Sequence, residues 1–383
     1  MIDKEEKNFE EVVEFLEGPG VRKWQFRDEG IKLINIKNIV DDNLVLDNTD
    51  KYLSVEEVEE KYPHFLLEAG DYVMASSGVT WGKIAEVKEE HLPLCLNTSI
   101  IKLKTKNENI LTKKYLYYFI KSSQFKNQIN RLITGSAQPN FGPSHLKQVT
   151  IMVPSVEEQE KCVEQLEQIN ELLENKVSTL NQVEKMKYDI FYKMFGNPSE
   201  NEKKWETALL EEYAQFYNGK AHEKVISDNG KYIVVNAKYI STSGEVLKTS
   251  DSQLFPLYKD DIVMVMSDIP NGKALAKCIK IDEDDKYTLN QRICAFRTNK
   301  MNKEFLKYLL NRNPYFLSFN DGNGQTNLRK EDILKCPIII PPIDLQNEFE
   351  EKIKILDEAE KTTNKIVEDL NNLLNIKMHE YYE

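Results

Sequence analysis

The sequence predicts an α+β protein with pseudo-twofold symmetry, in which two mixed α/β domains in tandem repeat are separated by two long, antiparallel, coiled-coil-like helices. Three observations predict this fold. Short motifs occur twice in the same order, each copy contains apolar runs typical of strands, and each copy ends in a long stretch with helical periodicity. The 383 residues also exceed what one ordinary hydrophobic core needs, so at least two domains are expected.

The repeat covers almost the whole chain. Matching motifs keep their order, and the spacing between the copies narrows slowly, as small loop insertions and deletions would produce. We interpret this as an internal duplication. The matching pairs include Gly18 with Gly219, Asp71 with Asp261, Gly82-Lys83 with Gly272-Lys273, Leu96-Asn97 with Leu289-Asn290, Gln138-x-Asn140 with Gln325-x-Asn327, and Gln159 with Gln346.

Each copy opens with a mixed α/β block. In the second copy, β-branched and apolar runs at residues 232–235, 262–265 and 292–296 predict strands. An amphipathic helix is expected around residues 113–127 and again around 303–311. A turn rich in Gly, Asn and Ser follows in each copy. A short apolar strand (residues 149–153 and 337–340) and a proline then close the block.

After that proline the apolar residues recur mainly every third or fourth position, which predicts a long amphipathic helix in each copy. Ser155 and Glu158 form a capping box for the first helix, and Gly196 marks its end. Asp344 is the predicted cap of the second. Pairing of the two helices with each other would bury both apolar faces. The alternative is that each helix packs separately on its own domain.

Composition narrows the class of protein. The sequence has no signal peptide pattern and no long apolar run, so a soluble cytoplasmic protein is expected. The five cysteines form no CxxC pair, which argues against a zinc site or a disulfide framework. The net charge of −12 is unusual for a protein that binds nucleic acid. However, the excess acid lies in residues 1–20, 151–200 and 341–383, and the blocks between them are slightly basic.

The end of the first copy resembles the specificity subunit of type I restriction–modification enzymes. The resemblance lies in residues 135–141, in the strand that ends at Pro154, and in Glu158-Gln159 at the start of a long helix. The second copy resembles it equally, with residues 324–328, Pro341-Pro342 and Gln346, although Leu345 replaces the glutamate. The resemblance implies target-recognition domains at residues 1–154 and 198–341. It also implies spacer helices at residues 155–197 and 342–383.

The resemblance further implies what the protein does. Each recognition domain would read one half of a split double-stranded DNA target. The chain would carry two copies of an adenine-specific methyltransferase and, in the full complex, an ATP-dependent restriction subunit. No catalytic, cofactor-binding or metal-ligating residue is predicted.

Three pairs of segments are predicted to contact DNA, each with a structural alternative. The basic segments after Gly18 and Gly219 suit phosphate and base contacts, or are solvated turns. The polar loops that contain the Gly-Lys pairs face DNA, or are ordinary hairpin turns. The paired Gln and Asn contact DNA, or bind local backbone. The predicted residues are Arg22, Lys23, Trp24, Gln25, Ser77, Thr80, Trp81, Lys83, Gln138, Asn140, Lys220, His222, Lys224, Asn271, Lys273, Gln325 and Asn327.

Parts of the sequence are compatible with other functions. Residues 138–141 superficially resemble the Asn-Pro-Pro-Phe motif of adenine methyltransferases. The second copy lacks both the proline and the aromatic residue, and the chain has no glycine-rich loop for S-adenosylmethionine. A loop-to-helix connection is therefore the favoured interpretation. The remaining alternatives are the specificity subunit of a related methyltransferase or nuclease system, and a coiled-coil scaffold that binds proteins alone.

Overall fold

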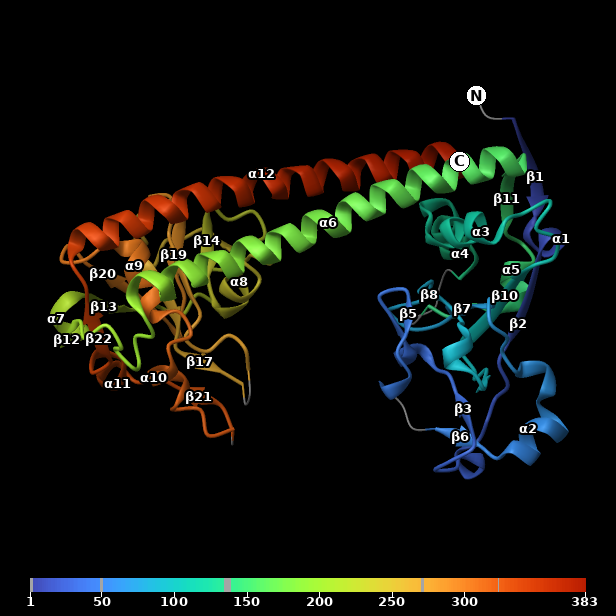
Figure 1. Ribbon diagram of the computed structural model, residues 1–383, viewed down its shortest axis with the longest axis horizontal. Helices are drawn as coiled ribbons and strands as arrows, with labels where there is room; N and C mark the ends of the chain where they lie inside the picture. The colour runs from blue at the N-terminus through green and yellow to red at the C-terminus, as the bar shows by residue number, and fades with distance from the viewer. Residues whose placement is uncertain (1–2, 49–50, 134–138, 270–271, 323) are drawn as a thin grey trace. The chain divides into compact units, whose positions relative to one another are not determined.

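The computed structural model describes residues 3–48, 51–133, 139–269, 272–322 and 324–383 (Figure 1). The chain divides into two compact units. Unit 1 comprises Met1–Val177 and Lys365–Glu383, and unit 2 comprises Ser178–Asn364. Each unit therefore contains one copy of the repeat and one part of each long helix. In the described part of the chain, every helix is too short or too polar to cross a membrane.

Unit 1 is built on a four-stranded antiparallel sheet with the order β2-β10-β7-β8. A smaller sheet, β6-β3-β9, has one parallel pair, β3 with β9. Two further pairs are β1 with β11 and β4 with β5. The strands are β1 (Lys4–Asn8), β2 (Val13–Glu17), β3 (Ile31–Leu33), β4 (Ile39–Val40), β5 (Asn43–Leu44), β6 (Tyr52–Leu53), β7 (Tyr72–Ala75), β8 (Ile84–Glu86), β9 (Leu94–Cys95), β10 (Ile100–Thr105) and β11 (Thr150–Pro154).

Unit 2 repeats this topology. Its four-stranded sheet has the order β13-β20-β16-β18, its smaller sheet is β15-β14-β19 with β14 and β19 parallel, and β12 pairs with β22. The added pair is β17 with β21. The strands are β12 (Glu206–Leu209), β13 (Gln215–Asn218), β14 (Tyr232–Val235), β15 (Thr249–Ser250), β16 (Ile262–Val265), β17 (Ser267–Asp268), β18 (Cys278–Lys280), β19 (Tyr287–Leu289), β20 (Ile293–Arg297), β21 (Thr326–Asn327) and β22 (Pro337–Ile340). The predicted tandem α+β fold is confirmed.

Both faces of each central sheet are covered, which explains the unbroken apolar runs in the sequence. Successive side chains of a strand point to opposite faces. In β7, Tyr72 and Met74 pack into the core beneath α3 (Lys113–Lys121) and α4 (Ser123–Leu132), whereas Val73 packs into the core on the other face. In Figure 1, α3 and α4 lie between the central sheet of unit 1 and its long helices. Strand β16 divides its side chains between two cores in the same way.

The remaining helices are short, apart from α6 and α12. The sequence predicts one helix around residues 113–127, and this prediction is wrong: α3 ends at Lys121 and α4 begins at Ser123. The buried Ser122 separates them, because its hydroxyl caps α4 by accepting from Phe125 N at 3.2 Å.

The other short helices are α1 (Phe9–Val12), α2 (Val55–Lys61), α5 (Pro143–Leu146), α7 (Leu210–Tyr213), α8 (Ala237–Ser241), α9 (Lys303–Leu310), α10 (Pro314–Leu317) and α11 (Lys330–Leu334). There are 3-10 turns at Lys23–Gln25, Ile36–Asn38, Leu46–Asn48, Pro63–Phe65 and Glu89–His91.

The two long helices, α6 (Val156–Phe195) and α12 (Ile343–Tyr382), have 40 residues each. Glu158 N donates to Ser155 Oγ at 3.3 Å, and the chain leaves α6 at Gly196 with a φ of 76°, as the start and stop signals predicted. The predicted cap Asp344 is wrong. It lies inside the first turn of α12, and the carbonyl oxygen of Pro342 accepts from the N–H groups of the first turn instead.

Within each unit, α6 and α12 pack against each other. In unit 1, the hydroxyl of Tyr381 near the end of α12 donates to Gln165 near the start of α6. In unit 2, the buried Lys187 near the end of α6 contacts Asp357 (2.7 Å) and Glu360 in the first half of α12. The start of one helix thus lies beside the end of the other, so the predicted antiparallel pairing is confirmed.

The repeated glutamine at the start of each long helix has a structural role. Gln159 is buried, accepts from Thr112 N at 2.8 Å and donates to the carbonyl oxygen of Pro154 at 2.9 Å. Gln346 does the same with Asn302 N (2.9 Å) and the Pro341 carbonyl (2.7 Å). Each amide therefore ties the helix to the loop before α3 or α9. This role accounts for the glutamine in both copies.

Candidate nucleic-acid interface

Loops from distant parts of unit 1 meet at one end of its central sheet. Gly18 N, just after β2, donates to the Ile100 carbonyl at 3.1 Å, at the start of β10. Ser76 N, just after β7, donates to the Ser99 carbonyl at 3.0 Å, and Phe141 N donates to the Ser76 carbonyl at 3.0 Å. We call these segments, residues 18–20, 76–83, 97–100 and 139–141, the first loop cluster.

Unit 2 builds the same arrangement from the matching residues. Gly219 N donates to the Ile293 carbonyl (3.1 Å), Met266 N to the Arg292 carbonyl (2.9 Å), and Leu328 N to the Met266 carbonyl (2.8 Å). The second loop cluster comprises residues 219–224, 266–269, 272–277, 290–293 and 325–328. The motifs that repeat along the sequence therefore converge in space, once in each unit.

The repeated glycines and the repeated Leu-Asn pairs form one contact. A Cβ atom at Gly18 would lie 2.2 Å from the carbonyl oxygen of Asn97, and one at Gly219 would lie 1.9 Å from that of Asn290. Backbone atoms cannot yield to such an overlap, so both positions require glycine. These residues make up the common framework of the loop clusters. Their repetition is explained without any contact to a ligand.

The polar loop of the first cluster is a hairpin turn between β7 and β8. Gly82 N donates to the Ala75 carbonyl at 2.8 Å, and Gly78 N donates to the Pro139 carbonyl at 3.0 Å. The half-buried Trp81 packs edge-on against Phe141, with ring centroids 5.6 Å apart. Thr80 and Lys83 are exposed, and Ser77 pairs with the exposed Asn140. The structure thus brings Ser77, Trp81 and Asn140 together.

The polar loop of the second cluster is held by a carboxylate. Asp268 accepts from the backbone N–H groups of Ile269 (2.8 Å), Ala274 (2.7 Å) and Leu275 (3.1 Å). Lys273 is exposed on this loop. Gln325 donates to Ser267 Oγ at 2.6 Å, and Asn327 is exposed on β21 opposite Ser267. The predicted Gln138 and Asn271 lie outside the described residues.

Two predicted DNA contacts are buried, so both predictions are corrected. Gln25 donates to Glu57 (2.9 Å) and Tyr62 (3.0 Å), and its oxygen accepts from Arg22 N (2.8 Å). His222 contacts Thr288 Oγ1 at 2.9 Å and the Lys220 carbonyl at 2.6 Å. Their polar atoms bind partners inside the protein and do not face solvent. Both side chains therefore have structural roles.

The other basic residues remain exposed, and the structure places them differently in the two units. Lys220 adjoins the turn of the second cluster, because Lys220 N donates to the Leu289 carbonyl (3.0 Å) and Gln291 N to the Lys220 carbonyl (2.9 Å). Arg22, Lys23 and the 71% exposed Trp24 lie instead on the turn that Gln25 anchors to α2. Lys224 is exposed beyond His222.

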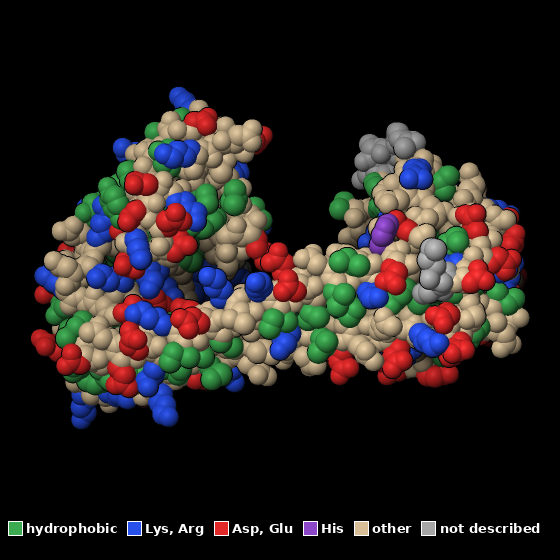
Figure 2. All heavy atoms as spheres, turned by 90° about the horizontal axis from the view of Figure 1, so that it is seen from above, with side chains coloured by type: hydrophobic (Ala, Val, Ile, Leu, Met, Phe, Trp, Pro, Cys, Tyr) green, Lys and Arg blue, Asp and Glu red, His purple; other side chains and the backbone are tan. Residues whose placement is uncertain are grey.

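Sequence reasoning missed some exposed residues of the clusters. Arg292 lies at a φ of 66° in the turn after the repeated Leu-Asn pair, and its side chain is exposed. The Leu-Asn repeat itself was the signal that could have found it. Val79 and Ile269 are exposed at the hairpin tips. Figure 2 shows Lys and Arg side chains interspersed with Asp and Glu on both units, and no continuous basic patch dominates the face shown.

The thiols are poor candidates for a nucleophile. All five cysteines are free and buried. Burial raises the pKa of Cys162 to about 11 and those of Cys95 and Cys336 to about 12, so these thiols stay protonated at neutral pH. Burial also raises the pKa values of Cys278 and Cys294. Among the described residues, no group of His, Cys, Asp and Glu is arranged to hold a metal ion.

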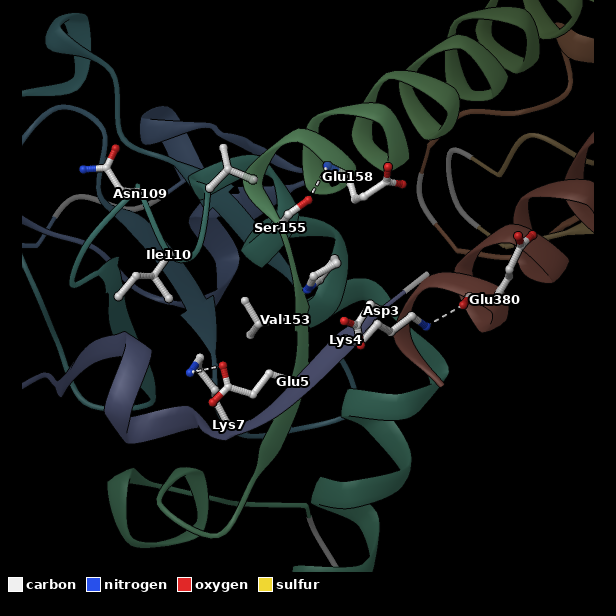
Figure 3. A pocket seen from close by; sticks show the side chains of 12 residues that line it. Asp3, Lys4, Glu5, Lys7, Asn109, Ile110, Val153, Ser155, Glu158 and Glu380 are labelled. Carbon is white, nitrogen blue, oxygen red and sulfur yellow. Dashed lines mark hydrogen bonds and ion pairs between the residues drawn. The ribbon is translucent and has the colours of Figure 1, made fainter. Parts of the chain in front are cut away.

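A wide hollow of about 1050 Å³ lies elsewhere in unit 1, beside β1, β11 and the start of α6 (Figure 3). Its polar side chains largely contact the protein itself. Lys4 donates to the Glu380 carbonyl at 2.7 Å, and Lys7 pairs with Glu5 at 2.7 Å. The hollow shares no residue with the first loop cluster. The candidate interface is therefore the pair of loop clusters.

The fold and these sites define a class of protein: a duplicated α/β protein that presents two equivalent loop clusters and pairs two long helices. The family profile of the type I restriction modification DNA specificity domain matches residues 1–185 and 202–375. The chain therefore belongs to this family.

Relatives and solved structures agree with the family. The chain is 30% identical over 191 residues to the type I restriction enzyme MjaVIII specificity subunit of Methanocaldococcus jannaschii, covering 49% of this chain and 44% of the relative. It is 23% identical over 279 residues to the MjaIX specificity subunit of the same organism, covering 65% and 63%. The matches thus span less than two thirds of either relative.

Two solved structures share the fold. The S subunit of a type I restriction-modification system from M. genitalium has a TM-score of 0.52 at 16% identity, covering 100% of this chain and 96% of that one. A chain from a study of complex assembly and conformational transition of the type I R-M system has a TM-score of 0.63 at 14% identity, covering 100% and 98%.

Proposed function

We propose that this chain is the specificity subunit of a type I restriction–modification complex and that each loop cluster reads one half of a bipartite double-stranded DNA target. The observation that carries the proposal is the construction of the two clusters. The same framework of glycine and Leu-Asn recurs in both units, whereas the loops mounted on it differ. A protein that reads two different half-sites needs this combination of a constant scaffold and variable contacts.

The residues on the clusters suit DNA recognition. Exposed Lys83 and Lys273 occupy matching positions, and lysine is a common phosphate contact. The amides of Asn140, Gln325 and Asn327 are of the type that reads adenine edges in the major groove. Where the copies diverge, Thr80-Trp81 stands in place of Pro270-Asn271. Divergence at this point would give the two half-sites different sequences.

The partners follow from the duplicated architecture. Two units of the same fold would offer two equivalent docking surfaces, which suits two copies of an adenine-specific methyltransferase. An ATP-dependent restriction subunit would complete the cleaving form of the complex. The chain itself would supply no catalytic residue and would act in the cytoplasm, where the DNA lies. In such a complex, the methyltransferase subunit would supply the catalytic residues.

The test is to exchange one reader and sequence the methylated sites. Residues 205–340 are replaced by the matching segment of a homologous chain, and the chimera is expressed with its methyltransferase. One half of the methylated sequence should change while the other stays the same. The reciprocal exchange of the first reader is the matched control and should change the opposite half. Changes in both halves after either exchange would contradict independent reading, and methyl transfer by the purified chain alone would contradict a non-catalytic role.

A further inference from the structure

Each hairpin tip carries an exposed aliphatic side chain at the same position of the repeat. Val79 is 98% exposed and Ile269 is 69% exposed. Each precedes the repeated Gly-Lys pair, Gly82-Lys83 or Gly272-Lys273, by the same number of residues. Single exposed aliphatic residues are common on protein surfaces, so exposure alone means little. The matching position in two diverged loops requires another explanation.

The described backbone beside both side chains is also held in place. Around Val79, Gly78 N donates to the Pro139 carbonyl (3.0 Å) and Trp81 N to the Gly78 carbonyl (3.3 Å). Around Ile269, its own N–H donates to Asp268 (2.8 Å), and its carbonyl accepts from Gly272 N (2.9 Å). The two loops therefore use different contacts to present the same kind of side chain. Side chains on backbone that is already hydrogen-bonded lose little conformational entropy on binding.

The surroundings of the tips indicate what they contact. An exposed lysine follows in each loop, and the exposed Asn140 or Asn327 pairs through its backbone with Ser77 or Ser267. Such neighbours suit phosphates and polar base edges. An aliphatic group among them needs an apolar partner on the same ligand. In the major groove of DNA, that partner is the C5 methyl group of thymine.

We propose that Val79 and Ile269 each contact a thymine methyl group, one in each half of the target, and so help to determine its sequence. This inference rests on the proposed function. If the partner methylates adenine in both halves, each half-site contains at least one A·T pair and hence a thymine. The lysine of each loop then anchors the backbone while the aliphatic tip reads a base.

The experiment uses the chain in complex with its methyltransferase and the target found by sequencing methylated DNA. Each thymine of the target is replaced singly by deoxyuridine, which lacks the methyl group. In each half-site, one replacement should weaken binding about fourfold, the value of one buried methyl-sized group. V79A should remove this sensitivity in the first reader's half alone, and I269A in the other half alone. Both residues are exposed, so neither substitution should disturb folding.

K83A and K273A are the matched controls and should weaken binding while leaving the pattern of deoxyuridine sensitivity unchanged. The inference is overturned if the wild-type complex binds all deoxyuridine targets equally. It is also overturned if V79A and I269A keep the wild-type pattern of deoxyuridine sensitivity, whether or not they weaken binding overall. A weaker affinity with that pattern unchanged would indicate a contact that does not depend on the base. Absence of any sequence-specific methylation by the wild-type complex would instead contradict the proposed function.

Discussion

The two loop clusters share one framework but hold their hairpin loops by different means. In unit 1 an aromatic contact, Trp81 on Phe141, supports the loop. In unit 2 the carboxylate of Asp268 supports the loop by accepting from three backbone N–H groups. The difference teaches that the framework fixes where the loop starts and ends. How the loop is supported differs between the two units.

The glycine that repeats in both loops, Gly82 or Gly272, meets a different structural requirement in each. Gly82 has a φ of 81° with open space around it, so its backbone conformation favours glycine. At Gly272 a Cβ atom would lie 2.2 Å from a carboxylate oxygen of Asp268, so the close approach favours glycine there. A shared residue in two copies is therefore weak proof of a shared contact.

The largest expected effect tests the framework. G18A or G219A should destabilise its own unit by roughly 3 kcal/mol, because the added methyl group overlaps a backbone oxygen. Thermal unfolding monitored in each variant measures this loss. G20A is the matched control, since a Cβ there meets nothing within 4 Å. A G18A protein as stable as G20A would show that the framework tolerates movement.

The next effect tests the supports of the loops. D268A leaves the N–H groups of Ile269, Ala274 and Leu275 without their acceptor, at a cost of about 2 kcal/mol. W81A removes a half-buried ring, at about 1–2 kcal/mol. Hydrogen exchange should speed up in the affected loop alone, and reading of that half-site alone should weaken. W81F, which keeps an aromatic ring, should lie between W81A and the wild type. Equal changes in both loops would contradict separate supports.

The contacts between α6 and α12 also differ between the units. In unit 1 Tyr381 donates to Gln165, whereas in unit 2 Lys187 pairs with Asp357 and Glu360. Burial by itself lowers the pKa of Lys187, but the carboxylates of Asp357 and Glu360 outweigh it and raise the pKa above 10.5. The contribution to stability is therefore fully present below pH 10.5 and lost as the pH rises through the raised value. K187M should lower stability by about 1 kcal/mol at pH 7, in chemical denaturation. K185M, at an exposed neighbour, should change nothing measurable. If K187M and K185M had the same free energy of unfolding, the ion pairs of Lys187 would not contribute to stability.

The smallest effect concerns the matching lysines. K83A and K273A should each weaken DNA binding similarly for all sequences and reduce the slope of log affinity against log salt by about one. Titrations at several salt concentrations measure both quantities. A substitution that changes the preferred bases instead would place that lysine on a base edge. In that case the two loops would differ in their phosphate contacts as well as in their supports.

The sequence by itself determined the duplication, the order of the domains and the two long helices. It did so because glycine positions, apolar periodicity and capping residues are local signals, and each occurred twice. The resemblance to type I specificity subunits, confirmed by the family profile, added the proposed function that these signals alone do not name. The predicted DNA contacts remain predictions, and Gln138 and Asn271 lie outside the described residues.

The tertiary structure decided which polar residues are available. Gln25 and His222 look like surface residues in the sequence, but their partners Glu57 and Thr288 lie far along the chain. A polar side chain is buried only where such partners satisfy it, and no local pattern shows them. The exposure of Val79 and Ile269 was hidden for the same reason. Whether an apolar side chain enters a core depends on what packs over it, and at these loop tips nothing described does.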